Sequence, residues 1–145
     1  MQLQPFHIAI PVNDLLAARR FYIDLLGCSE GRSSKDWVDF NMYGHQVVCH
    51  LVNSIAASSL SKNAVEGEEV PIPHFGVVLL WHDWEVLARH LSALNATFTL
   101  KPDVRFVDQP GEQATFFITD PAGNVLEFKA LRTPENLFAR NKDDH

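Results

Sequence analysis

The chain has 145 residues and a formal net charge of −6, and 46% of its residues are hydrophobic while 21% are charged. This composition is that of an ordinary globular protein able to bury a core, so disorder is not expected. The chain has no cluster of Lys and Arg residues of the kind that binds nucleic acid. Its apolar stretches are far shorter than the roughly 20 residues of a membrane helix. We therefore expect neither nucleic acid nor a membrane among its partners.

The N-terminus and the cysteines indicate the cellular compartment. Residues 1–5 lack the basic region that begins a secretory signal. Cys28 and Cys49 lie in apolar segments and do not form a CxxC motif, which argues against a disulfide framework or a zinc knuckle. We predict a reduced, cytoplasmic protein.

The first half of the chain predicts a strand, a helix and two further strands. Residues 6–12 (F-H-I-A-I-P-V) have the composition of a buried strand. Asp14 then supplies a cap for an apolar pattern of helical spacing, which ends at Gly27. The two strands that follow are expected at residues 37–42 and 46–52.

The second half repeats this order after a segment of different composition. Residues 53–70 are rich in Ser, Ala, Asn and Glu and have no sustained period, which predicts a linker that is mobile or acts as a lid. A strand at 73–80 and a helix at 83–94 come next. Three strands complete the repeat, at 97–100, 114–119 and 125–129, with a tight turn over 120–124.

The chain is therefore interpreted as an internal duplication, and two histidines mark equivalent points of the copies. His7 is the second residue of the first strand, and His74 opens the corresponding strand of the second copy. The expected helix starts, Asp14 and Asp83, follow at similar intervals. The predicted organisation is a first module, a linker, a second module and a C-terminal tail, at residues 1–52, 53–70, 71–132 and 133–145.

The same histidines are candidate metal ligands. Strand alternation makes His7 the one large polar side chain among small neighbours on its face. A single strand His or Glu is more often structural or solvated than a ligand. Two equivalent histidines together with Glu127 on the last strand, however, match the two-His, one-carboxylate set that leaves positions open on a divalent metal. We predict that His7, His74 and Glu127 bind one ion of iron, manganese, zinc or nickel.

Three segments resemble the vicinal oxygen chelate superfamily: H-I-A-I-P-V-N-D-L-L-A-A-R-R-F-Y, P-H-F-G-V-V-L and D-P-A-G-N-V-L-E-F. That superfamily includes glyoxalase I, extradiol ring-cleaving dioxygenases, fosfomycin-resistance enzymes and bleomycin-binding proteins. The resemblance runs from about residue 6 to residue 129, and D-P-x-G-N-x-x-E-F is its most specific part. It implies an α+β fold of two βαβββ modules, which form a cup-shaped mixed sheet with the helices outside, and a homodimer.

The resemblance also implies roles for individual residues. It assigns His7, His74 and Glu127 as ligands, and it assigns the remaining site-facing position, on the last strand of the first module, to His50. In glyoxalase-like members that position is typically a fourth ligand, often Glu. In ring-cleaving dioxygenases it is a His that acts on bound oxygen and catecholate, so His50 favours the dioxygenase pattern with Fe(II), although a His can also bind metal.

One segment departs from the dioxygenase pattern. Those enzymes resemble S-F-Y-x-x-T-P-x-G before the ligand Glu, with a tyrosine that assists catechol deprotonation, whereas this chain has Phe117, which cannot donate a hydrogen bond. Residues 104–113 also lack the His that those enzymes usually have there.

Three functions follow as alternatives. The leading one is an extradiol dioxygenase-like oxidoreductase that acts on a small vicinal-oxygen substrate, with Fe(II) as metal and His50 as acid-base group. The second is a glyoxalase I-like lyase or isomerase in which His50 is a fourth ligand. The third is a non-enzymatic binding protein of the bleomycin type, a class that generally lacks the metal residues present here.

The remaining polar residues are assigned to the rim of the site or to the surface. Arg105 with residues 110–113, and Arg32 with its neighbours in the first module, are candidates for a substrate rim. The other histidines are interpreted as turn, structural or solvent-facing residues, namely His45, His82, His90 and His145.

Overall fold

The structure is a computed structural model that describes residues 1–55 and 61–142. The chain divides into two compact units. The first consists of Met1–Ser58 with Asp120–Asn124, and the second of Ser59–Thr119 with Val125–His145. No helix in the described part of the chain is long and apolar enough to cross a membrane.

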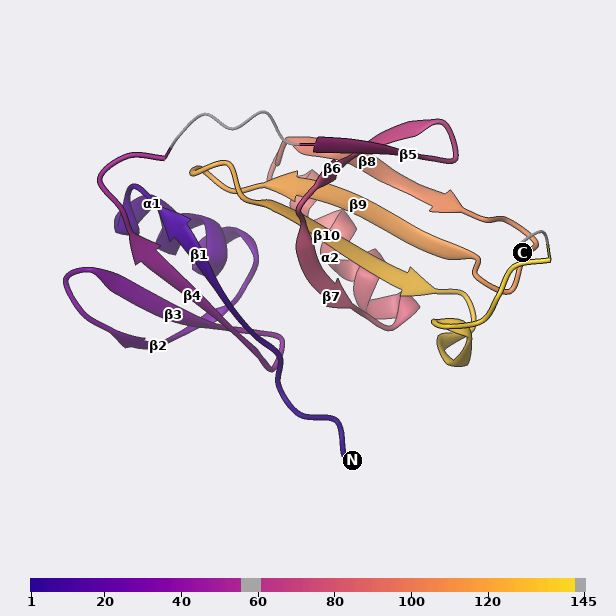
Figure 1. Cartoon of the computed structure of the whole chain (residues 1–145), viewed down its shortest axis with the longest axis horizontal. Helices are drawn as coiled ribbons and strands as arrows, with labels where there is room; N and C mark the ends of the chain where they lie inside the picture. Colours follow the sequence, from indigo (N-terminus) through magenta and orange to yellow (C-terminus); the bar gives the residue numbers. More distant parts are fainter. Residues whose placement is uncertain (56–60, 143–145) are drawn as a thin grey trace. The chain divides into compact units, whose positions relative to one another are not determined.

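The first unit is one βαβββ module (Figure 1). Its four-stranded sheet has the order β1-β4-β3-β2, in which β1 is parallel to β4 and the other neighbours are antiparallel. The strands are β1 (His7–Val12), β2 (Ser29–Ser33), β3 (Trp37–Met42) and β4 (His45–Leu51).

The helical segment of this unit starts where the sequence predicts. The Asp14 carboxylate accepts a hydrogen bond from the Ala17 backbone N–H at 3.0 Å, so it caps α1 (Leu15–Arg19). The segment continues as the π-helical η1 (Arg20–Leu25), and Gly27 follows with a positive φ of 75°. The helix prediction is confirmed at both ends.

The second unit repeats the module with the same topology. Its sheet has the order β7-β10-β9-β8, again with one parallel pair, β7 with β10. The elements are β7 (Phe75–Val78), α2 (Trp81–Ala93), β8 (Phe98–Arg105), β9 (Gln113–Thr119) and β10 (Val125–Leu131). The α+β class and the two βαβββ modules are therefore confirmed.

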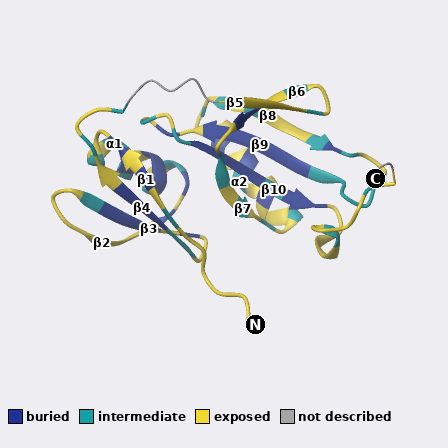
Figure 2. Ribbon diagram, viewed as in Figure 1, coloured by how far each residue is buried: buried dark blue, intermediate teal, exposed yellow. Residues whose placement is uncertain are grey.

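The core of the second unit lies between α2 and its sheet. Figure 2 shows β9 and β10 as buried along most of their length. Trp84 on α2 is buried, donates from its indole N–H to the Phe128 carbonyl at 2.9 Å, and contacts the Phe116 ring. Because strand side chains alternate, Phe116 and Phe128 face the helix while Phe117 and Glu127 face the opposite side of the sheet.

Part of the expected linker is a β-hairpin instead. β5 (Ser61–Val65) and β6 (Glu68–Ile72) pair antiparallel, and the positive φ angles of Glu66 and Gly67 form the turn between them. Val70 packs in a cluster with Phe117 and Val125. The expectation that 53–70 lacks strands is therefore wrong for its second half, while residues 56–60 lie outside the described part of the chain.

Two smaller differences concern elements with weak sequence signals. The sequence does not predict β2, because its residues S-E-G-R-S show no apolar alternation, and in the structure all five are exposed. Helix α2 begins at Trp81 rather than Asp83, and its N-cap, Leu80, makes no side-chain cap hydrogen bond. The C-terminal tail contains a short 3₁₀ helix, η2 (Pro134–Asn136), and residues 143–145 lie outside the described part.

The D-P-A-G-N turn belongs to the first unit, where it is held by a buried hydrogen bond. Tyr22 is fully buried, stacks on Phe40, and donates its hydroxyl proton to Asp120 Oδ2 at 2.8 Å. Burial and the nearby Asp120 carboxylate raise the pKa of Tyr22, so this proton stays in place. Asn124 also donates to the Pro11 carbonyl at 2.9 Å. This most specific motif of the sequence therefore has a structural role in addition to leading into β10.

Candidate metal centre

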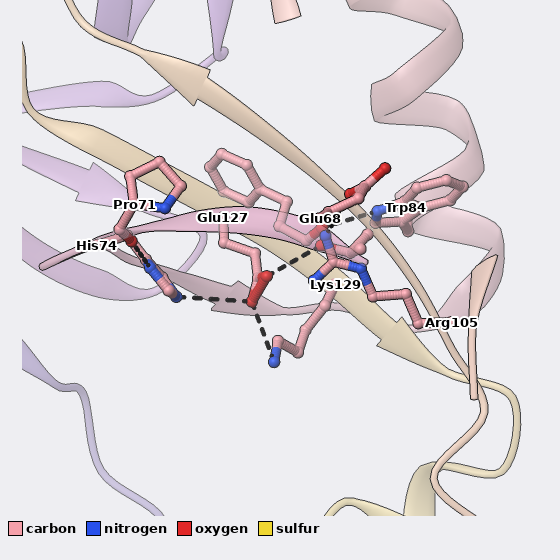
Figure 3. A network of polar contacts seen from close by, with 9 residues as sticks. Glu68, Pro71, His74, Trp84, Arg105, Glu127 and Lys129 are labelled. Atoms are coloured by element: carbon pink, nitrogen blue, oxygen red, sulfur yellow. Dashed lines mark hydrogen bonds and ion pairs between the residues drawn. The ribbon is translucent and has the colours of Figure 1, made fainter. Parts of the chain in front are cut away.

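The second unit brings two of the predicted ligands together. His74 immediately precedes β7, and its Nε2 lies 3.8 Å from Oε1 of Glu127 on the neighbouring strand β10 (Figure 3). His74 Nδ1 lies 2.7 Å from the Pro71 carbonyl oxygen. A carbonyl only accepts, so in the neutral ring Nδ1 carries the proton and the Nε2 lone pair remains free for a metal. Metal-binding histidines in proteins are held in this way.

Glu127 is buried, with 7% of its surface exposed, and its two oxygens have different partners. Oε2 accepts a hydrogen bond from the Thr115 hydroxyl at 3.1 Å. Oε1 faces His74 and also lies 3.0 Å from Nζ of Lys129 (Figure 3). These contacts compensate the burial of the carboxylate and leave one oxygen directed toward the histidine.

Gly76 permits the close approach of β7 to β10 at this point. It is the direct partner of Glu127 in the strand register, and a Cβ built on it would clash with the Glu127 carbonyl group. A larger residue would therefore displace the backbone of Glu127.

We predict that Gly76→Ala lowers the free energy of unfolding by about 1–3 kcal/mol, because the added methyl group must push two paired strands apart. Urea denaturation measures this change. Val78→Ala is the matched control, since Val78 is exposed on the same strand and should change stability by less than about 0.5 kcal/mol. Equal stability of Gly76→Ala and wild type would contradict this packing.

Phe117 forms an apolar wall beside the pair. It is the direct partner of Glu127 on β9, is fully buried, and makes an edge contact with the His74 ring at 4.9 Å between centroids. The guanidinium carbon of Arg105 lies 5.8 Å from the centroid of the Phe117 ring. The same guanidinium donates from Nη2 to Oε2 of Glu68 at 2.7 Å. Arg105 is only 5% exposed, and its place in a substrate rim stays a prediction.

The first unit carries His7 at the start of β1. The His7 side chain is exposed, and its Nδ1 lies 2.8 Å from Oε1 of Gln46 on β4. Gln46 in turn donates from Nε2 to Oδ2 of Asp39 at 2.9 Å. His7 is therefore oriented by a side chain, whereas His74 is oriented by a backbone carbonyl.

The strand register distinguishes His50 from the residue equivalent to Glu127. Glu127 pairs with Gly76, two residues beyond His74. In the first unit, the residue two positions beyond His7 is Ala9. Its partner on β4 is Val48. Val48 is thus the equivalent of Glu127, and His50 lies two residues further, about 7 Å along the strand. Both residues face the same side, so alternation alone could not distinguish them.

The other histidines have positions of their own. His45 opens β4 and its Nδ1 accepts a hydrogen bond from the Phe6 backbone N–H at 2.9 Å, which fixes the start of β1. His82 and His90 are exposed on α2, and His145 lies outside the described residues.

Over residues 1–55 and 61–142, no three His, Cys, Asp or Glu side chains form a group that could hold a metal ion. The predicted donors are divided between the first unit, with His7 and His50, and the second, with His74 and Glu127.

Duplicated βαβββ modules, with a histidine at the first strand of each and a glutamate on the last strand, define a class of paired-module proteins that includes metal-dependent enzymes. The chain belongs to the Glyoxalase/Bleomycin resistance protein/Dioxygenase superfamily, whose family model matches residues 4–128. This membership confirms the resemblance seen in the sequence. No curated protein matches the chain.

Solved structures of the superfamily resemble the chain over most of its length. A glyoxalase/bleomycin resistance protein/dioxygenase from Alicyclobacillus acidocaldarius is 29% identical, with a TM-score of 0.76, and covers 93% of this chain and 96% of its own. A glyoxalase family protein from Bacillus anthracis is 16% identical, with a TM-score of 0.63, over 91% and 98%. A fosfomycin resistance protein from Listeria monocytogenes is 18% identical, with a TM-score of 0.62, over 94% and 98%. The last two likenesses concern the fold alone.

Proposed function

We propose that the chain is a metal-dependent enzyme that acts on a small molecule through two neighbouring oxygens. Its metal ligands are His7, His74 and Glu127. The separation of 3.8 Å between His74 Nε2 and Glu127 Oε1, with the lone pair of Nε2 free, supports this assignment. When bound, a divalent ion supplies Lewis acidity, and Fe(II), the favoured ion, also supplies redox chemistry; Mn, Zn and Ni are alternatives.

The proposed reaction class is that of an extradiol dioxygenase-like oxidoreductase. The observation that carries it is the apolar Val48 at the position equivalent to Glu127, because it leaves three protein ligands and therefore open positions for small molecules. His50, about 7 Å further along the strand, then holds or moves a proton at a substrate oxygen rather than binding the metal. Phe117 keeps water from one side of the carboxylate.

A glyoxalase I-like lyase or isomerase is the second candidate. Phe117 favours it, because no hydrogen-bond donor stands opposite Glu127 to assist deprotonation of a catechol. A bleomycin-type binding protein is the third candidate. The contacts that orient the rings of His7 and His74 for metal binding argue against it. In all three cases we propose a homodimer.

The test is to prepare chelator-treated protein, to reload it with Fe(II), Mn, Zn or Ni, and to measure two reactions. Oxygen uptake on a panel of catechols reports the first function, and isomerisation of hemithioacetals reports the second. Metal retention without either activity would favour a different reaction of the same site. No retention of any ion would contradict the metal assignment.

We predict that Lys129→Met strengthens metal binding about two- to fivefold. The Lys129 ammonium lies 3.0 Å from Glu127 Oε1 and competes with a metal for that oxygen. The ion pair is partly exposed, so its loss corresponds to roughly 0.5–1 kcal/mol. Competitive titration with a fluorescent chelator measures the change. Lys62→Met removes another Lys–Glu pair of the same unit, at 3.5 Å, and serves as the matched control.

A further inference from the structure

Three side chains form a hydrogen-bonded relay across the sheet of the first unit. It begins at Asp39 on β3, passes through Gln46 on β4, and ends at His7 on β1, with distances of 2.9 and 2.8 Å. His7 and Gln46 are direct partners in the parallel register, and Asp39 lies two residues along β3 from the partner of Gln46. All three side chains therefore lie on one face of the sheet.

The relay has only one consistent assignment of its protons. A carboxylate oxygen accepts, so the NH₂ end of the Gln46 amide must face Asp39. The carbonyl end of the same amide then faces His7 and can only accept. The proton of neutral His7 is consequently on Nδ1, and Nε2 presents its lone pair. A reversed Gln46 amide would require a proton on Nε2, which could not bind a metal.

The burial of Asp39 is difficult to explain by stability alone. Its exposed fraction is 6%, and its Oδ1 atom is buried without a hydrogen-bond partner among the described residues. A Cβ on Gly31 would lie 2.5 Å from this oxygen, so the glycine leaves room for it. Burial of an incompletely satisfied carboxylate destabilises a fold, and a valine or leucine would suit the position better.

We infer that Asp39 and Gln46 are positioning residues that select the Nδ1–H tautomer of His7 and thereby make Nε2 the metal donor. The inference rests on the proposed function in one respect, namely that His7 is a ligand. The two modules reach the same tautomer by different means, because His74 donates to the backbone carbonyl of Pro71. Among the described residues, the partner of His7 Nδ1 is the side-chain amide of Gln46, on which its tautomer depends.

Asp39→Asn tests the inference, because an asparagine can either donate or accept and no longer fixes the Gln46 amide. ¹⁵N NMR of the metal-free protein, at a pH where the imidazoles are neutral, reports which nitrogen of His7 carries the proton. We expect the Nδ1–H tautomer in wild type and a mixture in Asp39→Asn. Zn²⁺ affinity, from competitive titration, should fall about 10- to 100-fold in the variant.

Two further variants separate positioning from a general structural effect. The double variant combines Asp39→Asn with Gln46→Glu, which exchanges the amide and the carboxylate between the two positions. The amide at position 39 can donate to the carboxylate at position 46, and that carboxylate accepts from Nδ1 of His7 as Gln46 does in wild type. We expect it to regain the Nδ1–H tautomer and most of the Zn²⁺ affinity at unchanged net charge. Asp24→Asn removes one charge from an exposed position on η1 and should change neither measurement.

The outcomes distinguish the inference from the function on which it rests. An unchanged His7 tautomer in Asp39→Asn, or failure of the folded double variant to restore it, would overturn the relay. If the tautomer shifts as expected but wild type binds no metal, the relay stands and the metal proposal fails. Circular dichroism of each variant shows whether the module is folded.

Discussion

The His74→Ala variant should retain no divalent ion under conditions in which wild type holds about one ion per chain. The affinity should fall by more than about 100-fold, because loss of a ligand costs more than loss of a residue that only orients one. The fold should survive, since His74 precedes β7 and lies outside the cluster of buried apolar side chains. Elemental analysis after reloading measures the ion, and His82→Ala, an exposed histidine on α2, is the matched control.

Comparison of two glutamine variants extends this result. Glu127→Gln removes the negative charge of a buried side chain that we propose as a ligand, so it should weaken metal binding more than His50→Gln does. Titration of the two metal-free variants decides the question. Equal losses would place His50 among the ligands in spite of its register and would favour the glyoxalase-like reaction.

The proposed ligands belong to two different units, and this makes a mixing experiment informative. His7→Ala and His74→Ala chains each lack one donor. If the site combines units of different chains, unfolding and refolding the two variants together should restore binding in part, because some assemblies then contain a complete set. If each chain completes its own site, the mixture should bind no more than the separate variants.

Much of the fold could be predicted from the sequence because both modules carry the signals of regular elements. The Asp14 cap, the helical spacing after it and the positive φ of Gly27 act within a few residues of one another, so they can be recognised locally. The β5–β6 hairpin was missed although Glu66-Gly67 has the form of a hairpin turn. Its strands have few apolar residues, and only packing of Val70 against the second sheet reveals their role.

The candidate site could be predicted less completely, for a different reason. Strand alternation identifies which face a residue occupies, but residues two positions apart share that face, so His50 and Val48 are equivalent by this criterion. Only the pairing of β1 with β4 distinguishes them. The relay through Asp39 and Gln46 also cannot be predicted from the sequence, because it depends on the register of three strands and on the orientation of one amide.

The His50→Ala variant should lose turnover by about 10²–10⁴-fold while it retains metal and a substrate analogue. The reason is the position of His50. It lies on the same face as His7 and two residues beyond Val48, so we propose that it exchanges a proton with a small substrate and does not bind the metal. Binding and catalysis should therefore separate, as expected for a group that acts mainly in the transition state.

Phe117 gives the companion variant, because it stands directly opposite Glu127 and against the His74 ring. Phe117→Tyr adds a hydroxyl group at this wall and should raise any catechol cleavage by the iron-loaded protein if a missing donor limits that reaction. Oxygen consumption and hemithioacetal isomerisation are measured in parallel for wild type, His50→Ala and Phe117→Tyr. Activity in the second assay alone, or undiminished turnover in His50→Ala, would contradict the dioxygenase-like mechanism. The proposed ligands His7, His74 and Glu127 would then serve a different reaction, in which the ion acts as a Lewis acid.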